Sequence, residues 1–285
     1  MKIGIRRFAM RSRKVPHVIP GFSLSMGITI TFLSLMVLIP LASVVLSASE
    51  LGFSGLVKAV TGRRVLAGLR ISFLCALTAA LINAFFGVIL AWTLVRYKFP
   101  FKRLLDGLIE LPFALPTAVA GISLTAIYSS KGAIGAFFER MGFKIAYTST
   151  GIVVALVFIT IPFVVRTIQP VLEKLDPQFE EAAVMLGAGR ATIFFRIIFP
   201  EILPALLAGF GLAFARALGE YGSVVFIAGN APFKTEIAPL LIMAKLQQFD
   251  YNGATAIALV MLAASFAILL AINSTLIYFG KFVKD

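Results

Sequence analysis

The chain has 285 residues, of which 60% are hydrophobic and 14% are charged, and its mean hydropathy is +0.98. Because charged residues make up about a quarter of an average soluble domain, this composition excludes a soluble globular protein and indicates an integral membrane protein. The net charge of +13 does not indicate nucleic-acid binding, since the basic residues are dispersed between hydrophobic stretches and form no single basic face.

The N-terminal residues 1–18 form a basic segment with six Lys and Arg residues. The uncharged stretch that follows, residues 15–49, is longer than the apolar core of a signal peptide, which has about 7–15 residues. It therefore predicts a first membrane span that is retained, over about residues 19–47.

Four more apolar runs reach the length of about 20 residues that a helix needs to cross a bilayer. They predict spans over about residues 68–95, 105–128, 148–168 and 252–279. A further span is predicted over about residues 203–228, although two charged residues interrupt it. The expected fold is therefore an all-α polytopic membrane protein with six transmembrane helices, in a single transmembrane domain over residues 19–280.

The basic residues predict how the spans are oriented. Six spans place both termini on the same side of the membrane; the loops on that side hold 16 Lys and Arg residues, and the opposite loops hold 9. The positive-inside rule then places both termini and the polar loop 169–200 in the cytoplasm. The first outer loop departs from the rule, because it holds four cations.

The third expected span contains Pro112 and Pro116, which remove backbone hydrogen bonds from a helix. The two prolines permit either a kinked packing helix or an unwound stretch that lines a cavity. Asp106 and Glu110, near the start of this span, are expected to be charges at the cytoplasmic interface.

The polar loop 169–200 contains a short amphipathic helix. Asp176 can cap its first turn, Pro177 suits the first helical position, and Gly187 and Gly189 end it. Residues at helical spacing form one apolar stripe: Phe179, Ala182, Ala183 and Leu186. A helix this short is marginal alone and cannot span a bilayer, so the pattern predicts that it binds a partner.

At this helix the sequence resembles the membrane subunits of bacterial ABC importers, whose EAA signature runs EAA, three residues, Gly, nine residues, Ile, one residue, Leu-Pro. The matching residues are Glu181, Ala182, Ala183, Gly187, Ile197 and Pro200, with Phe199 in place of the leucine. The resemblance implies that this coupling helix docks into a groove of a separate ATPase. The residues expected to couple the two subunits are Asp176, Phe179, Glu180, Glu181, Ala182, Ala183, Leu186, Gly187, Ile197 and Pro200.

Three segments, residues 111–128, 169–188 and 214–230, look like the T-type permease subunits of sulfate/thiosulfate importers. The resemblance implies a type I ABC importer permease in the bacterial inner membrane. It also implies four kinds of partner: two ATPase subunits, a second homologous permease, a periplasmic sulfate-binding protein and the lipid bilayer. The aromatic residue that often follows the signature glycine in relatives is absent here.

Arg216 and Glu220 lie inside the fifth expected span, where charges are costly and face a partner or a watery cavity. Their spacing of four residues places them on one helix face. Two interpretations stay open. The residues form a mutual ion pair at a subunit interface, or Arg216 faces the translocation path and binds a passing oxyanion while Glu220 tunes it. Pro112 and Pro116 are further candidates for the path.

The chain lacks the sequence motifs of nucleotide hydrolysis and of metal binding. It contains no phosphate-binding loop and no HExxH motif, and it has one histidine and one cysteine, Cys75. We therefore expect no catalytic residue, no metal site and no cofactor on this chain, with ATP and magnesium bound by the partner ATPase. Two alternatives remain: a permease for molybdate, tungstate or another oxyanion, and a secondary anion carrier or channel that needs no ATPase.

Overall fold

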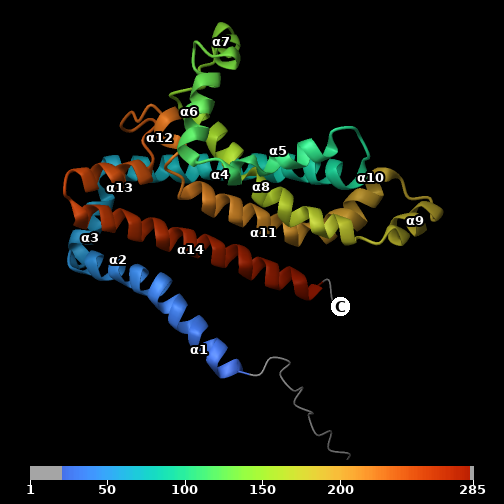
Figure 1. Ribbon diagram of the computed structural model, residues 1–285, viewed down its shortest axis with the longest axis horizontal. Helices are drawn as coiled ribbons and strands as arrows, with labels where there is room; N and C mark the ends of the chain where they lie inside the picture. Colours follow the sequence, from blue (N-terminus) through green and yellow to red (C-terminus); the bar gives the residue numbers. More distant parts are fainter. Residues whose placement is uncertain (1–20, 283–285) are drawn as a thin grey trace, which may run out of the picture. The chain divides into compact units, whose positions relative to one another are not determined.

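The computed structural model of the protein describes residues 21–282, with side chains as far as Ser274. The expected basic segment 1–18 lies outside the described residues. All regular structure in the described residues is helical, without a strand (Figure 1). Among these residues, five helical stretches are long and apolar enough to cross a membrane, and a bent helix pair makes six if it is counted as one span. The all-α fold of a polytopic membrane protein, with five or six apolar spans, is thus confirmed.

The chain divides into two compact units, Met1–Leu46 and Ser47–Asp285. The described part of the first unit consists of α1 (Phe22–Leu33), η1 (Ser34–Leu38) and most of α2 (Ile39–Ser49). This helical stretch covers most of the expected first span, 19–47. The extent of a single domain over residues 19–280 stays a prediction.

The second unit contains both long membrane-length helices and short connecting helices. The long ones are α4 (Arg63–Arg96), α8 (Ser149–Lys174), α11 (Phe199–Leu218) and α14 (Tyr251–Phe282). The shorter ones are α3 (Gly52–Thr61), α5 (Lys102–Ala114), α6 (Thr117–Tyr128), α7 (Ala133–Arg140), α9 (Pro177–Met185), α10 (Arg190–Ile193), η2 (Phe194–Ile198), α12 (Val224–Ile227) and α13 (Ala238–Gln247). Of these, α7 lies at the tip of the α6–α7 arm, which projects from the helices α4, α8 and α11 (Figure 1).

The core of the second unit is formed by α4, α8 and α11, which pack against one another (Figure 1). Small residues bring these helices close: a Cβ atom added to Gly87 would lie 2.6 Å from Val164, and one added to Gly209 would lie 2.2 Å from Thr167 Oγ1. Buried Asn83 on α4 donates from Nδ2 to Thr160 Oγ1 on α8 at 2.8 Å. Close approach with interhelical hydrogen bonds is how helices associate where lipid replaces water.

Two expected spans differ from the helices that form. The span expected over 203–228 corresponds to continuous helix over Arg190–Leu218, so it takes residues from the expected loop and ends earlier. The helix ends at Leu218 and is followed by Gly219. A short non-helical segment then leads to α12, which is one helical turn long. The span expected over 105–128 is broken into α5 and α6, which are bent by 115° at Leu115 and Pro116.

Ion pairs fix the chain near the start of α4 and the start of α14. Arg64 donates from Nε and Nη2 to both carboxylate oxygens of Glu236, at 2.8 and 2.7 Å. Asp250 accepts from Lys245 Nζ at 2.5 Å and from the Gly253 N–H at 2.9 Å. These donors hold the pKa of the Asp250 carboxyl below its usual range, because they stabilise its charged form.

Candidate functional site

The expected coupling helix is present as α9, and its ends form as the sequence predicts. Asp176 accepts a hydrogen bond from the Gln178 N–H at Oδ1, 3.0 Å away, and Pro177 occupies the first helical position. The helix ends at Met185, and Gly187 follows with φ +82°, a conformation that favours glycine. These local predictions are confirmed; the role of the helix in binding an ATPase stays a prediction.

The residues of the apolar stripe expected on α9 differ in how exposed they are. Phe179 and Leu186 point outward with exposed fractions of 65% and 89%, and Met185 is equally open at 88%. Ala183 instead is buried in the hydrophobic core of the chain itself. Within the expected stripe, Ala183 is therefore buried against the chain, whereas Phe179 and Leu186, like Met185 beside them, remain largely exposed in the described part of the chain.

Glu180 connects α9 to the end of α4. Its Oε1 forms an ion pair with Arg96 Nη2, and the guanidinium carbon of Arg96 lies 5.3 Å from the centroid of the Trp92 ring. The glutamate side chain thus points into the chain. Nothing in the local sequence links residues 96 and 180, so sequence reasoning missed this contact.

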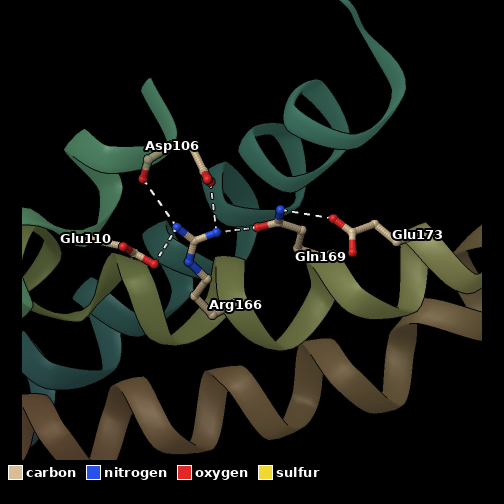
Figure 2. Close-up of polar contacts among 5 residues, drawn as sticks. All are labelled: Asp106, Glu110, Arg166, Gln169 and Glu173. Carbon is tan, nitrogen blue, oxygen red and sulfur yellow. Dashed lines mark hydrogen bonds and ion pairs between the residues drawn. The ribbon is translucent and has the colours of Figure 1, made fainter. Parts of the chain in front are cut away.

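Arg166 on α8 is the centre of a second polar cluster (Figure 2). Its Nη1 donates to Asp106 Oδ1 at 2.8 Å and to Gln169 Oε1 at 2.6 Å, and its Nη2 pairs with Glu110 Oε1 at 2.7 Å. Gln169 in turn donates from Nε2 to Glu173 Oε1 at 3.1 Å. The cluster ties α5, the first half of the broken span, to α8, which leads directly into α9.

The cluster and the cavity beside it hold charges of both signs. The carboxylates of Asp106 and Glu110 contact the Arg166 guanidinium, and the carboxylate of Glu173 accepts only from Gln169 (Figure 2). A cavity of about 470 Å³ beside it is lined by Leu94, Val95, Lys102, Arg103, Asp106, Gln169 and Glu173. The sequence indicated Asp106 and Glu110 as interface charges, but not their shared partner Arg166.

Arg216 and Glu220 form the ion pair that one interpretation expected, with 2.6 Å between Arg216 Nη1 and Glu220 Oε2. Helix α11 ends at Leu218, so Glu220 lies in the turn after the helix and not on its face. Oε1 of Glu220 also accepts from the Ser223 N–H at 2.8 Å and from Ser223 Oγ at 3.0 Å. The side chain of Glu220 is 2% exposed and that of Arg216 is 36% exposed, so the arginine is the accessible member of the pair.

The break between α5 and α6 lies against the turn that holds Glu220. A Cβ atom on Gly121 would lie 2.4 Å from the Ser223 carbonyl oxygen, and one on Gly222 would lie 2.2 Å from Thr117 Oγ1. Pro112 is inside α5, and Pro116 directly precedes α6. The structure thus brings together Pro116, Glu220 and Arg216, three of the four residues proposed for the path, through contacts between their segments.

The remaining residues of the signature differ in exposure. Ile197 in η2 is half-buried against the core, whereas Pro200, in the first turn of α11, is exposed. Glu181, Ala182 and Gly187 are exposed on or just beyond α9. The signature residues are therefore placed around α9 and its return to the membrane helices, with Ala183 as the buried member.

Comparison with known proteins gives a family and close relatives. Residues 83–283 match the family described as "Binding-protein-dependent transport system inner membrane component". The chain is 47% identical over 273 residues to the sulfate transport system permease protein CysT of Salmonella typhimurium, covering 96% of this chain and 98% of that protein. It is 46% identical to the protein of the same name from Escherichia coli, with the same coverage.

Solved structures agree with this fold. A bacterial ABC transporter involved in the import of the acidic polysaccharide alginate matches with a TM-score of 0.74 at 14% identity, covering 90% of this chain and 95% of that chain. The MetNI methionine ABC transporter matches with a TM-score of 0.55 at 16% identity, covering 76% of this chain and 94% of that chain. At these identities the likeness establishes the fold alone. Together with the family match, it shows that this chain belongs to the binding-protein-dependent transport system inner membrane components, the permease subunits of ABC importers.

Proposed function

We propose that the chain is the membrane-spanning subunit of an ATP-driven importer that carries sulfate or thiosulfate into the cell. The observation that supports the substrate is the likeness, over almost the full length, to relatives named sulfate transport system permease proteins. A periplasmic sulfate-binding protein delivers the anion, and a second homologous permease completes the pathway. Both termini lie in the cytoplasm, as the loop charges favour.

In this proposal α9 is the element on which two partner ATPase subunits act. Its exposed residues Phe179, Met185 and Leu186 offer an apolar surface to a groove of the partner. Ala183 is buried against the chain itself and so anchors the helix. ATP and magnesium bind to the ATPase subunits; closure of these subunits moves α9 and tilts the spans between inward-facing and outward-facing arrangements.

The coupling role can be tested by purification from native membranes. We expect a nucleotide-binding protein to co-purify with the wild-type chain, and Leu186→Asp to lose it because a carboxylate cannot enter an apolar groove without a large desolvation cost. Phe137→Asp on α7 places the same charge at another exposed apolar position, is the control, and should retain the partner. A secondary carrier would instead purify without the ATPase and transport without it. Uptake of labelled sulfate and molybdate by a deletion strain tests the substrate.

Arg216 is proposed to exchange its contact with Glu220 for the passing anion. Its partial exposure leaves guanidinium donors accessible, and a guanidinium binds an oxyanion through two parallel hydrogen bonds. We expect Arg216→Lys, which keeps the charge but loses the planar fork, to reduce sulfate uptake about tenfold while the protein inserts normally. Uptake at the wild-type rate by correctly inserted Arg216→Lys would contradict this role.

A further inference from the structure

Arg96, the last residue of α4, joins this helix to the coupling helix. The chain itself connects α9 only to α8 and α10, but the ion pair between Arg96 Nη2 and Glu180 Oε1 adds a contact with α4, 84 residues away in the sequence. The two side chains are 23% and 26% exposed. Water screens a pair that is this well covered less than a surface ion pair, so the attraction between its two charges is larger.

Trp92, one helical turn before Arg96, adds a contact with the residues that follow the coupling helix in the sequence. The Arg96 guanidinium lies against the Trp92 ring, and the Trp92 ring meets Phe194 edge to face with 5.6 Å between the ring centroids. Phe194 begins η2, which follows α9 and leads into α11. The last turn of α4 therefore holds both the helix α9 and the segment through which the chain returns from it.

Helix α4 is suited to pass a displacement onward. It has 34 residues, a length of about 50 Å, and packs along α8 and α11 through buried small residues. Closely packed interiors deform little, so a displacement at one end of such a helix reaches its neighbours.

We propose that Arg96 is a positioning residue that transmits the movement of α9 to α4. The inference rests on the proposed function, because it takes α9 to be the element on which the ATPase acts. In the transporter, Arg96 moves α4 together with α9 and so couples ATP hydrolysis to the rearrangement of the spans. Without this contact, α9 can move while α4 stays in place.

The test uses the complete transporter in liposomes and measures the sulfate taken up per ATP hydrolysed. Arg96→Gln removes the charge but keeps a polar side chain. We expect it to lower this ratio about fivefold or more, while the ATPase still co-purifies and still hydrolyses ATP. Lys98→Gln removes an exposed cation two residues further on and is the matched control, with a ratio equal to that of wild type.

Exchanging the charges of Arg96 and Glu180 distinguishes a role in transmitting movement from a role in folding alone. Glu180→Gln should lower the ratio as Arg96→Gln does, and the double variant Arg96→Glu with Glu180→Arg should recover at least about half of the wild-type ratio. An unchanged ratio in Arg96→Gln, no recovery in the double variant, or loss of the ATPase from Arg96→Gln alone would each overturn this inference. Absence of an ATPase from the wild-type complex would instead contradict the proposed function.

Discussion

Replacement of Glu220 by alanine is expected to lower the free energy of unfolding by about 3 kcal/mol. The carboxylate is 2% exposed and holds three donors: Arg216 Nη1, the Ser223 N–H and Ser223 Oγ. Its removal leaves the guanidinium without its partner and a buried N–H without an acceptor. The value is set at the lower end of the range of about 3–5 kcal/mol for breaking a buried pair, because Arg216 is 36% exposed and remains partly solvated. Equilibrium unfolding of the purified chain in detergent measures the change.

Two further variants distinguish the charge of Glu220 from its hydrogen bonds. Glu220→Gln keeps an acceptor for Ser223 and should cost less than Glu220→Ala. Combining it with Arg216→Met removes both charges, and the double variant should be more stable than Glu220→Gln alone, because no unpaired charge is left. If Glu220→Ala unfolds at the same denaturant concentration as wild type, the ion pair does not stabilise this part of the chain.

The features that the sequence predicts well are those set by neighbouring residues. Asp176, Pro177 and Gly187 act within one or two turns, so the start and end of α9 follow from local chemistry. Most of the spans follow in the same way from the length of each apolar run, but the bounds of the span predicted over 203–228 did not, because charges interrupt that run. The break in the third span was also indicated, since Pro116 directly precedes α6, but the bend of 115° depends on what α6 packs against.

Contacts between residues far apart in the chain could not be predicted from the sequence in this way. Arg96 with Glu180 and Arg166 with Asp106 are separated by 84 and 60 residues, and no spacing rule joins them. The burial of Ala183 against its own chain was not predicted, for a related reason. Periodicity shows that a helix face is apolar, but not whether that face packs against the same chain or another one. Similarly, the spacing of Arg216 and Glu220 indicated a shared helix face, whereas Gly219 ends the helix between them.

Gly121 is the second position where we expect a large effect, because two backbones meet there. A Cβ atom at this position would lie close to three backbone atoms of Ser223: 2.4 Å from the carbonyl oxygen, 2.7 Å from the Cα and 2.9 Å from the carbonyl carbon. Backbone atoms cannot rotate away as a side chain would, so Gly121→Ala must push α6 off the turn that contains Ser223. We expect a loss of about 1–3 kcal/mol in the free energy of unfolding, in the range of overpacked cores.

The broken span itself supplies the control for this prediction. Gly107 lies inside α5, and no described atom would come within 4 Å of a Cβ atom there, outside the helix's own nearby backbone. Alanine is favoured over glycine in a helix by about 1 kcal/mol, so Gly107→Ala should leave stability unchanged or raise it. Because Ser223 also donates to Glu220, Gly121→Ala should disturb the Arg216–Glu220 pair and lower sulfate uptake as well, whereas Gly107→Ala should not. Equal stability and uptake for the two alanine variants would mean that α6 does not seat against the Glu220 turn in the working transporter.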